Sequence, residues 1–323
     1  MMSLSKKWSA ALLTVFACSF AGSTLAADKK VVLSQAYQSM LYLPLYVAID
    51  GGFFKKEGLD VIKQTAGSPS TALSAVISGS SDFSLHGPEW TAIAASKGAP
   101  VDVIADVANG AAVWIVTTPD FKFNSVKDLQ GQKVVSGLMP TTGTSLFLKL
   151  LKENGMDQSS VKLTQVQQGT EIGPLFAGQT KVAVMSEPNL DRAVAQGMKV
   201  VLGFPKLYGD YTFCAIAARK NVDPDAAQRL VNGLQQALAY MRSDPQGTTE
   251  IAKKEFPTLE PAIVEAAVHR LLTEGVYPKS VDISKAALST AMATQIALGN
   301  LKVQPDYSEL VAQKYIHQAT VAK

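Results

Sequence analysis

The stretch KVVSGLMPTTGTSLFLKLLKENG, residues 133–155, shows how this chain is built. Residues 133–137 predict a strand, and a polar turn that contains a glycine follows it. Residues 144–154 then predict a helix. The apolar side chains of that helix recur at three- and four-residue steps and so share one face: Leu146, Phe147, Leu150 and Leu151. A strand, a turn and an amphipathic helix in direct succession form the building block of α/β proteins.

The same alternation extends on both sides of this unit. Short apolar segments, typical of strands that are covered on both faces, alternate with helical patterns. The pattern therefore predicts an α/β fold with right-handed crossovers and mainly parallel sheets. We expect strands at residues 31–36, 60–65, 82–85, 101–107, 113–117, 133–137, 162–166, 182–185, 200–204 and 212–218. We expect helices between them at residues 44–50, 70–78, 90–96, 144–154, 172–177 and 189–196.

After Asp223 the pattern becomes purely helical. Asp223 can cap a helix that has Pro224 in its first turn. Further helices are predicted at residues 245–255, 262–273 and 283–298, with a short last one near 307–316. At about 150 residues per domain, the length of 323 residues suggests two lobes. We expect the chain to cross between the lobes where strand-like residues are followed by Gly or Pro. These crossings predict a first lobe from residues 28–114 and 213–323 and a second lobe from residues 115–212.

Residues 1–27 have the three parts of a secretory signal. Two lysines precede an apolar run over residues 9–21, and small residues follow it. We expect cleavage after Ala26 or Ala27 and a periplasmic location. A lipid anchor on Cys18 is the alternative, but the bulky Phe16 disfavours it.

The composition excludes several classes of protein. With 47% hydrophobic and 18% charged residues, the chain is globular rather than disordered. Without the signal it keeps 28 basic against 27 acidic side chains and no basic block, so we expect neither nucleic-acid binding nor stable membrane insertion. Cys214 is then the one remaining cysteine, and it lies in an apolar run, which favours burial and excludes an internal disulfide.

Residue patterns that would support catalysis are nearly absent. The chain has no P-loop, no Gly-x-Ser-x-Gly turn and no Rossmann glycine pattern. Its histidines, His86, His269 and His317, are far apart and show no metal-ligand spacing. Gly87 and Pro88 separate His86 from Glu89 and argue against a regular helix there. We therefore expect no catalytic residue, no metal and no cofactor.

Two strand-to-helix turns stand out instead, at residues 67–70 and 140–145. Ser68 can cap the first helix, and Pro69 suits its first position. Helix starts leave free N–H groups and a partial positive charge, which can bind an anion or another oxygen-bearing ligand. Ordinary capping is the alternative for either turn alone. Two such turns in successive α/β blocks favour a ligand cleft at the carboxyl ends of the strands.

Four segments carry a resemblance to a known family. They are LPLYVAIDGGFFKKEGLDV at residues 43–61, ISGSSDF at 77–83, SVKDLQGQKV at 125–134 and VAVMSEP at 182–188. In this order they resemble the periplasmic substrate-binding proteins of ABC importers for nitrate, sulfonates, taurine and thiamine-pyrimidine precursors. The resemblance covers about residues 31–213.

The resemblance implies a type II binding-protein fold, in which two α/β lobes joined by a two-segment hinge enclose a small molecule. Its partners would be the importer's permease and ATPase, and the receptor would act as a monomer. Carried over to the strand ends of this chain, the ligand-binding positions would be Gln38, Ser39, Tyr42, Ser68, Ser70, His86, Glu89, Asn109, Thr142, Gly143, Thr144, Ser145 and Glu187. The side chains of Tyr42, Trp90 and Trp114 could stack on a planar ligand.

These positions leave the ligand open. None of them is Lys or Arg, whereas Glu89 and Glu187 are acidic, which favours an aminated or heteroaromatic molecule over nitrate. Glu89 could equally be a first-turn helix residue, and Glu187 could brace a helix start. Two other functions remain as alternatives. One is a hydroxymethylpyrimidine synthase, although such enzymes carry a Cys-Cys-Cys-Phe-Cys motif that this chain lacks, and the other is a periplasmic sensor domain.

Overall fold

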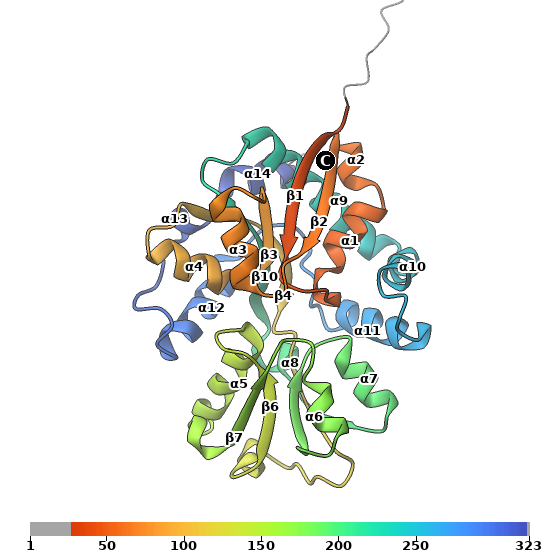
Figure 1. Ribbon diagram of the computed structural model, residues 1–323, viewed down its shortest axis with the longest axis vertical. Coiled ribbons are helices and arrows are strands. Elements are labelled where there is room, and N and C mark those ends of the chain that lie inside the picture. Colours follow the sequence, from red (N-terminus) through yellow and green to blue (C-terminus); the bar gives the residue numbers. More distant parts are fainter. Residues whose placement is uncertain (1–26, 322–323) are drawn as a thin grey trace, which may run out of the picture.

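The computed structural model describes residues 27–321, which form two lobes, each built around a five-stranded sheet (Figure 1). The predicted secretory signal spans residues 1–27, and all of it except Ala27 lies outside the described residues. Cys18 and the expected cleavage after Ala26 therefore lie outside them too. The structure thus does not test the predicted signal or the lipid anchor.

The sheet of the first lobe is mixed, with the strand order β2-β1-β3-β10-β4. β1 runs parallel to β2 and β3, whereas β10 runs antiparallel to both β3 and β4. Its strands are β1 (Lys29–Gln35), β2 (Leu59–Thr65), β3 (Phe83–His86), β4 (Val101–Gly110) and β10 (Asp210–Arg219).

The sheet of the second lobe repeats this arrangement, with the order β7-β6-β8-β5-β9. β6 is parallel to β7 and β8, and β5 is antiparallel to β8 and β9. Its strands are β5 (Trp114–Thr117), β6 (Lys133–Gly137), β7 (Lys162–Val166), β8 (Val182–Met185) and β9 (Lys199–Gly203). The expectation of mainly parallel sheets was wrong for β5 and β10. Each of these strands enters its sheet from the other lobe rather than through a helical crossover, so the crossover rule does not set its direction.

The chain passes between the lobes twice. Residues 111–113 join β4 to β5, and Gly209 joins α8 (Phe204–Tyr208) to β10. Gly110 and Asp210 are partners in the β4–β10 ladder, so the two passages lie side by side. The left-handed φ of 62° at Gly209 is one that glycine adopts without steric cost. Two adjacent short connections form a hinge.

Short helices cover the sheets. In the first lobe they are the 3₁₀ turn η1 (Met40–Tyr42), α1 (Leu43–Asp50), α2 (Phe53–Lys56), α3 (Pro69–Ser78) and α4 (Pro88–Ser96). In the second they are η2 (Val126–Leu129), α5 (Thr142–Glu153), η3 (Gln158–Ser160), α6 (Ile172–Phe176), α7 (Asn189–Ala195) and α8. The predicted apolar face of α5 is buried, as its spacing indicated.

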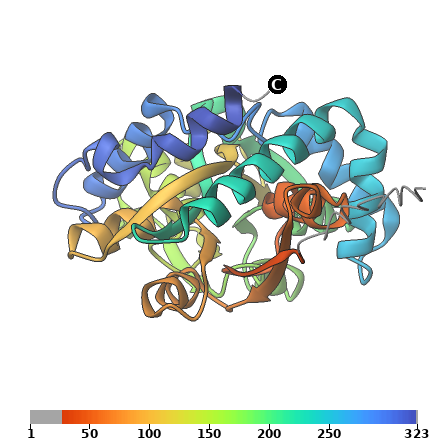
Figure 2. The ribbon, with the colours of Figure 1, turned by 90° about the horizontal axis from the view of Figure 1, so that it is seen from above.

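The C-terminal helices pack mainly on the first lobe, and Figure 2 shows them, in teal and blue, gathered along one side of the molecule. They are α9 (Pro224–Ser243), α10 (Pro245–Glu255), α11 (Pro261–Thr273), α12 (Lys285–Ala297), α13 (Tyr307–Leu310) and α14 (Gln313–Val321). α9 begins as predicted, with the Asp223 carboxylate accepting two backbone N–H groups. The single last helix predicted near 307–316 is wrong: Val311 is extended and bridges to β4, which divides it into α13 and α14.

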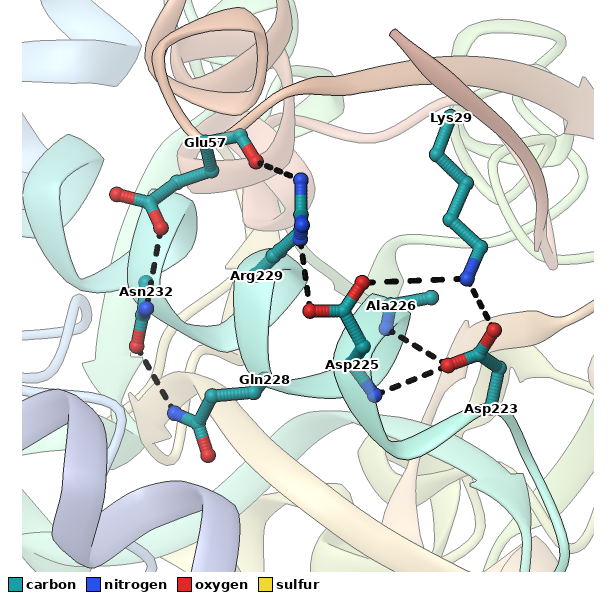
Figure 3. A network of polar contacts seen from close by, with 8 residues as sticks. All are labelled: Lys29, Glu57, Asp223, Asp225, Ala226, Gln228, Arg229 and Asn232. Carbon is teal, nitrogen blue, oxygen red and sulfur yellow. Dashed lines mark hydrogen bonds and ion pairs between the residues drawn. The ribbon is translucent and has the colours of Figure 1, made fainter. Parts of the chain in front are cut away.

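A polar network fixes α9 to the end of the first lobe where β1 begins (Figure 3). Lys29 forms an ion pair with Asp223, the cap of α9. Arg229 binds the Asp225 carboxylate at 2.9 Å and donates to the backbone oxygen of Glu57 at 3.2 Å. These contacts are largely exposed, so they align the helix with the loop after α2 and add little stability. Within the described range, no helix is both long and apolar enough to cross a membrane.

Candidate functional site

The carboxyl ends of β1, β2 and β3 face the second lobe, and two adjoining cavities lie there. The smaller, called the inner niche, has a volume of about 10 Å³, on the order of one water molecule. The first lobe lines it with Tyr37, Pro69, Gly87, Glu89, Trp90, Phe213 and Cys214, and the second with Thr141, Thr142, Gly143 and Gln168.

The larger cavity, called the outer chamber, has a volume of about 190 Å³ and shares Tyr37 and Gln168 with the inner niche. The first lobe lines it with Tyr37, Gln38, Ser39, Phe256, Thr258 and Leu259. The second lobe contributes Gln168, Gly169, Glu171, Ser186, Glu187, Pro188, Asn189 and Arg192. A bigger hollow of about 830 Å³ lies among the C-terminal helices, but residues of the first lobe alone line it. The two cavities between the lobes therefore form the candidate site.

Glu89 connects the two lobes across the inner niche. The hydroxyl of Thr142 donates a hydrogen bond to Glu89 Oε1 at 2.8 Å, and both side chains are buried. The helix α4 begins at Pro88, directly before Glu89, with Gly87 as its cap. No regular helix holds both His86 and Glu89, as predicted, because His86 ends β3 and Gly87 is extended. The helix begins two residues earlier than expected, since proline at the first helical position loses no intrahelical hydrogen bond.

The buried carboxyl of Glu89 has an unusual protonation equilibrium. Burial raises its pKa to about 7, although hydrogen bonds from Thr142 and from backbone N–H groups act in the opposite direction. None of the described Lys and Arg side chains forms an ion pair with it to offset the cost of burial. A ligand with a positive or strongly donating group would supply that missing partner.

The turn after β6 faces the niche with only two of its predicted residues. α5 begins at Thr142, two residues earlier than expected, so Thr142 and Gly143 form its first turn and line the niche. Thr144 instead donates to the backbone oxygen of Gly137 at 2.7 Å. Ser145 contacts the sulfur of Met139 at 3.8 Å, so it too is engaged within the second lobe.

Two of the predicted positions, Gln38 and Ser39, line the outer chamber from the side of the first lobe. The Gln38 amide donates to the backbone oxygen of Glu255 at 2.8 Å. Ser39 Oγ accepts from the N–H of Leu41 at 3.2 Å and caps η1. Both side chains therefore line the chamber, and both are already hydrogen-bonded to residues of the first lobe.

Glu187 also borders the outer chamber, but its carboxylate belongs to an ion cluster between the lobes. Arg270, from α11 of the first lobe, binds Glu187 Oε1 at 2.9 Å and Asp191 Oδ1 at 2.6 Å. Glu187 Oε2 accepts the backbone N–H of Asp191 at 3.1 Å. Glu187 therefore braces the start of α7, which was the alternative expected from the sequence. Arg270, Glu187 and Asp191 are called the interlobe ion cluster below.

Besides Thr144 and Ser145, five more predicted positions line neither cavity. Tyr42 is fully buried, and its ring stacks on Tyr37 with the centroids 5.6 Å apart. Ser68 caps α3, while Ser70 is exposed beside it. His86 is buried between Ser84 and the backbone oxygen of Gly87, at 3.0 and 2.9 Å, and burial lowers its pKa to about 4. Asn109 lies within β4 rather than after it, because pairing with β10 extends that strand to Gly110.

Several lining residues were absent from the predicted set. Tyr37, next to the predicted Gln38, lines both cavities, and its position directly after β1 was the available signal. Trp90 lines the inner niche, as its predicted stacking role allows, whereas Trp114 is buried and donates to Glu274 at 3.2 Å. Arg192 follows the Glu-Pro pair by four residues, one helical turn into α7, and was not expected.

The family profile described as "NMT1/THI5 like" matches residues 40–248. YtlA of Bacillus subtilis, named a putative binding protein, is 22% identical over 303 residues, which cover 91% of each chain. A 4-amino-5-hydroxymethyl-2-methylpyrimidine phosphate synthase of Schizosaccharomyces pombe is 23% identical over 241 residues, 69% of this chain and 68% of its own. A formylaminopyrimidine-binding protein of Halalkalibacterium halodurans is 28% identical over 142 residues, 44% of this chain and 42% of its own.

Solved structures share the fold. The alkanesulfonate-binding protein SsuA of Xanthomonas axonopodis pv. citri, bound to MOPS, superposes with a TM-score of 0.69 at 16% identity, over 91% of this chain and 97% of its own. The periplasmic nitrate-binding protein NrtA of Synechocystis PCC 6803 gives 0.73 at 16% identity, over 91% and 89%. The two mixed sheets and the C-terminal helices are thus those of the periplasmic binding-protein fold.

Proposed function

Because this chain belongs to the NMT1/THI5-like family, we propose that it is the solute receptor of an ABC importer. It captures a small organic molecule between its lobes in the periplasm and delivers it to the permease, which the importer's ATPase drives. The relative matched over 91% of this chain is named a binding protein, which supports this role. The receptor works as a monomer, with lobes formed by residues 28–114 with 213–323 and by 115–212.

The observation that carries this proposal is the closure of the inner niche by residues from both lobes. Glu89 comes from the first lobe and Thr142 from the second, and their hydrogen bond is buried. A ligand seated there touches both lobes, so it favours the closed state over the open one. A hinge of two short segments permits that movement, and closure creates the surface that a permease can recognise.

The ligand belongs to one of two groups that the neighbours suggest. One is a small sulfonate, taurine or nitrate-like anion, and the solved relatives bind alkanesulfonate and nitrate. The other is a pyrimidine of the type named in the sequence relatives. At the first turn of α5 the backbone N–H of Thr142 already donates to Glu89, and the N–H of Gly143 suits an oxygen-bearing group of either kind.

An enzyme of the pyrimidine phosphate synthase type is the second candidate, because two relatives carry that name. Cys214, which lines the inner niche, argues against cysteine chemistry there. It is fully buried, and burial raises its pKa well above that of a free thiol, so the reactive thiolate is disfavoured. The sequence also lacks the Cys-Cys-Cys-Phe-Cys motif. A periplasmic sensor domain is the third candidate, and the neighbouring genes separate it from an importer receptor.

A thermal-shift screen tests the receptor function. The panel contains methanesulfonate, taurine, nitrate, aminopyrimidines and flavins, and each compound is recovered afterwards to detect any chemical change. A true ligand at a hundred times its Kd stabilises the protein by about 2.7 kcal/mol and is recovered intact. Conversion of a bound compound would contradict a receptor without catalysis.

A pair of glycine variants locates the binding. Gly143→Asp puts a carboxylate at the start of α5 in the niche, so binding of an acidic compound should be lost. Gly173→Asp on α6 is the matched control, since nothing lies within 4 Å of a Cβ added at Gly173. Equal affinity in both variants would remove the α5 turn from the site.

A further inference from the structure

The inner niche combines a buried acid with very little space. Its volume of about 10 Å³ admits one group the size of a water molecule, which is also the size of an amino group. The Glu89 side chain is 2% exposed, and the neutral Thr142 hydroxyl is its partner from the second lobe. Burying a carboxylate without a cation is costly, so a positive group in this niche would be strongly favoured.

The outer chamber offers the opposite charge. Arg192, on α7, lines it and donates one hydrogen bond, from Nη1 to Asn189 Oδ1 at 3.0 Å. The described residues supply no carboxylate within ion-pair distance of Arg192, and its guanidinium retains further N–H donors. Such a planar group matches a carboxylate, sulfonate or phosphate with two parallel hydrogen bonds.

The two other acids of the chamber are already engaged. Glu171 accepts the N–H of Gly169 at 2.9 Å and approaches the amide of Asn189 at 3.5 Å. Glu187 is held in the interlobe ion cluster by Arg270. Among the charged side chains that line the two cavities, Glu89, Glu171 and Arg192 have no ion-pair partner among the described residues. Glu89 is the one acid that lines the inner niche, and Arg192 is the one cation that lines the outer chamber.

We infer that the solute carries a basic nitrogen, seated against Glu89, and an acidic group, held by Arg192. This inference rests on the proposed receptor function and names the ligand class of the same site. Tyr37 and Gln168 line both cavities, so the niche and the chamber adjoin at these two side chains, and the proposed solute reaches from one into the other past them. A simple anion such as nitrate, or a simple amine, satisfies one half of the site and leaves the other half unpaired.

Two kinds of molecule have this chemistry, and Trp90 distinguishes them. Its Nε1–H is buried beside the niche without a hydrogen-bond partner. An aliphatic ammonium offers no acceptor to this N–H group, whereas an aminated heteroaromatic ring offers a ring nitrogen. A Trp90→Phe variant should therefore weaken binding of a heteroaromatic compound and leave an aliphatic one unchanged.

The test uses two sets of three compounds in isothermal titration calorimetry. The aliphatic set is taurine, isethionate, which lacks the amine, and ethanolamine, which lacks the acid. The heteroaromatic set is 4-aminopyrimidine-5-carboxylate, pyrimidine-5-carboxylate and 4-aminopyrimidine. In the set that matches the site, we expect the complete compound to bind at least about tenfold more tightly than either half, since each half lacks one charge-assisted contact.

Charge variants assign each contact. Glu89→Gln should weaken the complete compound and the base-only compound by roughly tenfold or more, but not the acid-only compound. Arg192→Gln should do the reverse, and Arg192→Lys should recover most of the loss. Glu260→Gln, at the cap of α11, and Arg242→Gln, on α9, are matched controls because neither residue lines a cavity.

Each outcome decides the inference. A half compound that binds as tightly as the complete one overturns the paired charges while leaving the receptor function intact. The inference is also overturned if none of the six compounds binds. Native mass spectrometry of protein purified from the periplasm then shows whether another small molecule is bound. If none is found, the receptor function fails as well.

Discussion

Two of the contacts between the lobes bury carboxylates in opposite ways. At the inner niche, Glu89 accepts a hydrogen bond from the neutral Thr142, and burial raises its pKa to about 7. At the interlobe ion cluster, Glu187 is equally buried but lies 2.9 Å from the Arg270 guanidinium. One acid thus lacks a counter-charge and the other has one.

The difference separates binding from closure. A carboxylate that already has a cation, such as Glu187, gains little from a ligand, and it stabilises the closed arrangement of the lobes by itself. A carboxylate without a cation, such as Glu89, makes closure favourable when a proton or a ligand neutralises it. The cluster therefore serves to hold the lobes in register, and the niche serves to respond to the solute.

The largest effect is expected from Arg270→Met. This change leaves Glu187 and Asp191 buried side by side without a cation, which should lower the free energy of unfolding by about 3–5 kcal/mol. Urea denaturation measures it, and small-angle scattering should show wider separation of the lobes. Adding Glu187→Gln and Asp191→Asn should recover most of the loss. If that triple variant is no more stable than Arg270→Met, charge repulsion is not the cause.

The second effect is a pH dependence that Glu89→Gln removes. In the folded protein the pKa of Glu89 is about 7, above the value of about 4.5 for a free glutamate. Its protonated form therefore stabilises the fold below pH 4.5, and this stability is lost as the pH rises towards 7, by about 3 kcal/mol at most. Glutamine does not titrate. The variant should thus gain stability over the native chain between pH 4.5 and 8 in ligand-free denaturation curves.

Glu171 provides the control for this pH dependence. Burial also raises its pKa to about 7, and it is unchanged in Glu89→Gln, so the difference between the two proteins isolates Glu89. A constant difference across the whole pH range would show that Glu89 ionises normally in the folded protein.

A smaller effect is expected from Thr142→Val, which keeps the side-chain volume but removes the donor to Glu89. Glu89 keeps its hydrogen bonds from backbone N–H groups, so the lost hydrogen bond to this carboxylate should cost about 1.5–3 kcal/mol, which chemical denaturation at pH 8 measures. Thr142→Ser retains the hydroxyl and should restore most of the stability. Stability that is kept in the valine variant and lost in the serine variant would mean that packing of the methyl group, rather than the hydrogen bond, joins the lobes.

The smallest effect should come from the exposed network of Figure 3. Lys29→Gln removes the ion pair with Asp223, but solvent screens both side chains. We expect no measurable change in the midpoint of urea denaturation and unchanged ligand affinity. A loss comparable to that of Thr142→Val would show that α9 depends on this contact.

Much of the fold follows from local patterns. Residues 133–137 and 162–166 are strands with the predicted bounds, and α10 spans the predicted residues 245–255. The direction of β5 and β10 could not be predicted this way, because each pairs with a neighbour brought in by the chain passing between the lobes. That pairing also extends β4 through Asn109.

Only part of the candidate site could be predicted from the sequence. Glu89 and Thr142 follow strand ends, and both line the niche, whereas their binding of a ligand stays a prediction. Arg270 lies 83 residues from Glu187 in the sequence, so no spacing rule connects them. His86 and Thr144 share the same strand-end placement, but their side chains turn towards neighbours in their own lobe. Side-chain direction depends on such tertiary contacts and is invisible in a strand-end pattern.

Both limits of the described range, from Lys29 at the start of β1 to α14, lie in the first lobe, so the second lobe is inserted between β4 and β10. Fluorophores attached near the two limits would keep a constant separation while the lobes move. An optical sensor of solute capture therefore requires one dye on the inserted lobe, for instance at the exposed Phe176 of α6, and its partner on the body that carries β1.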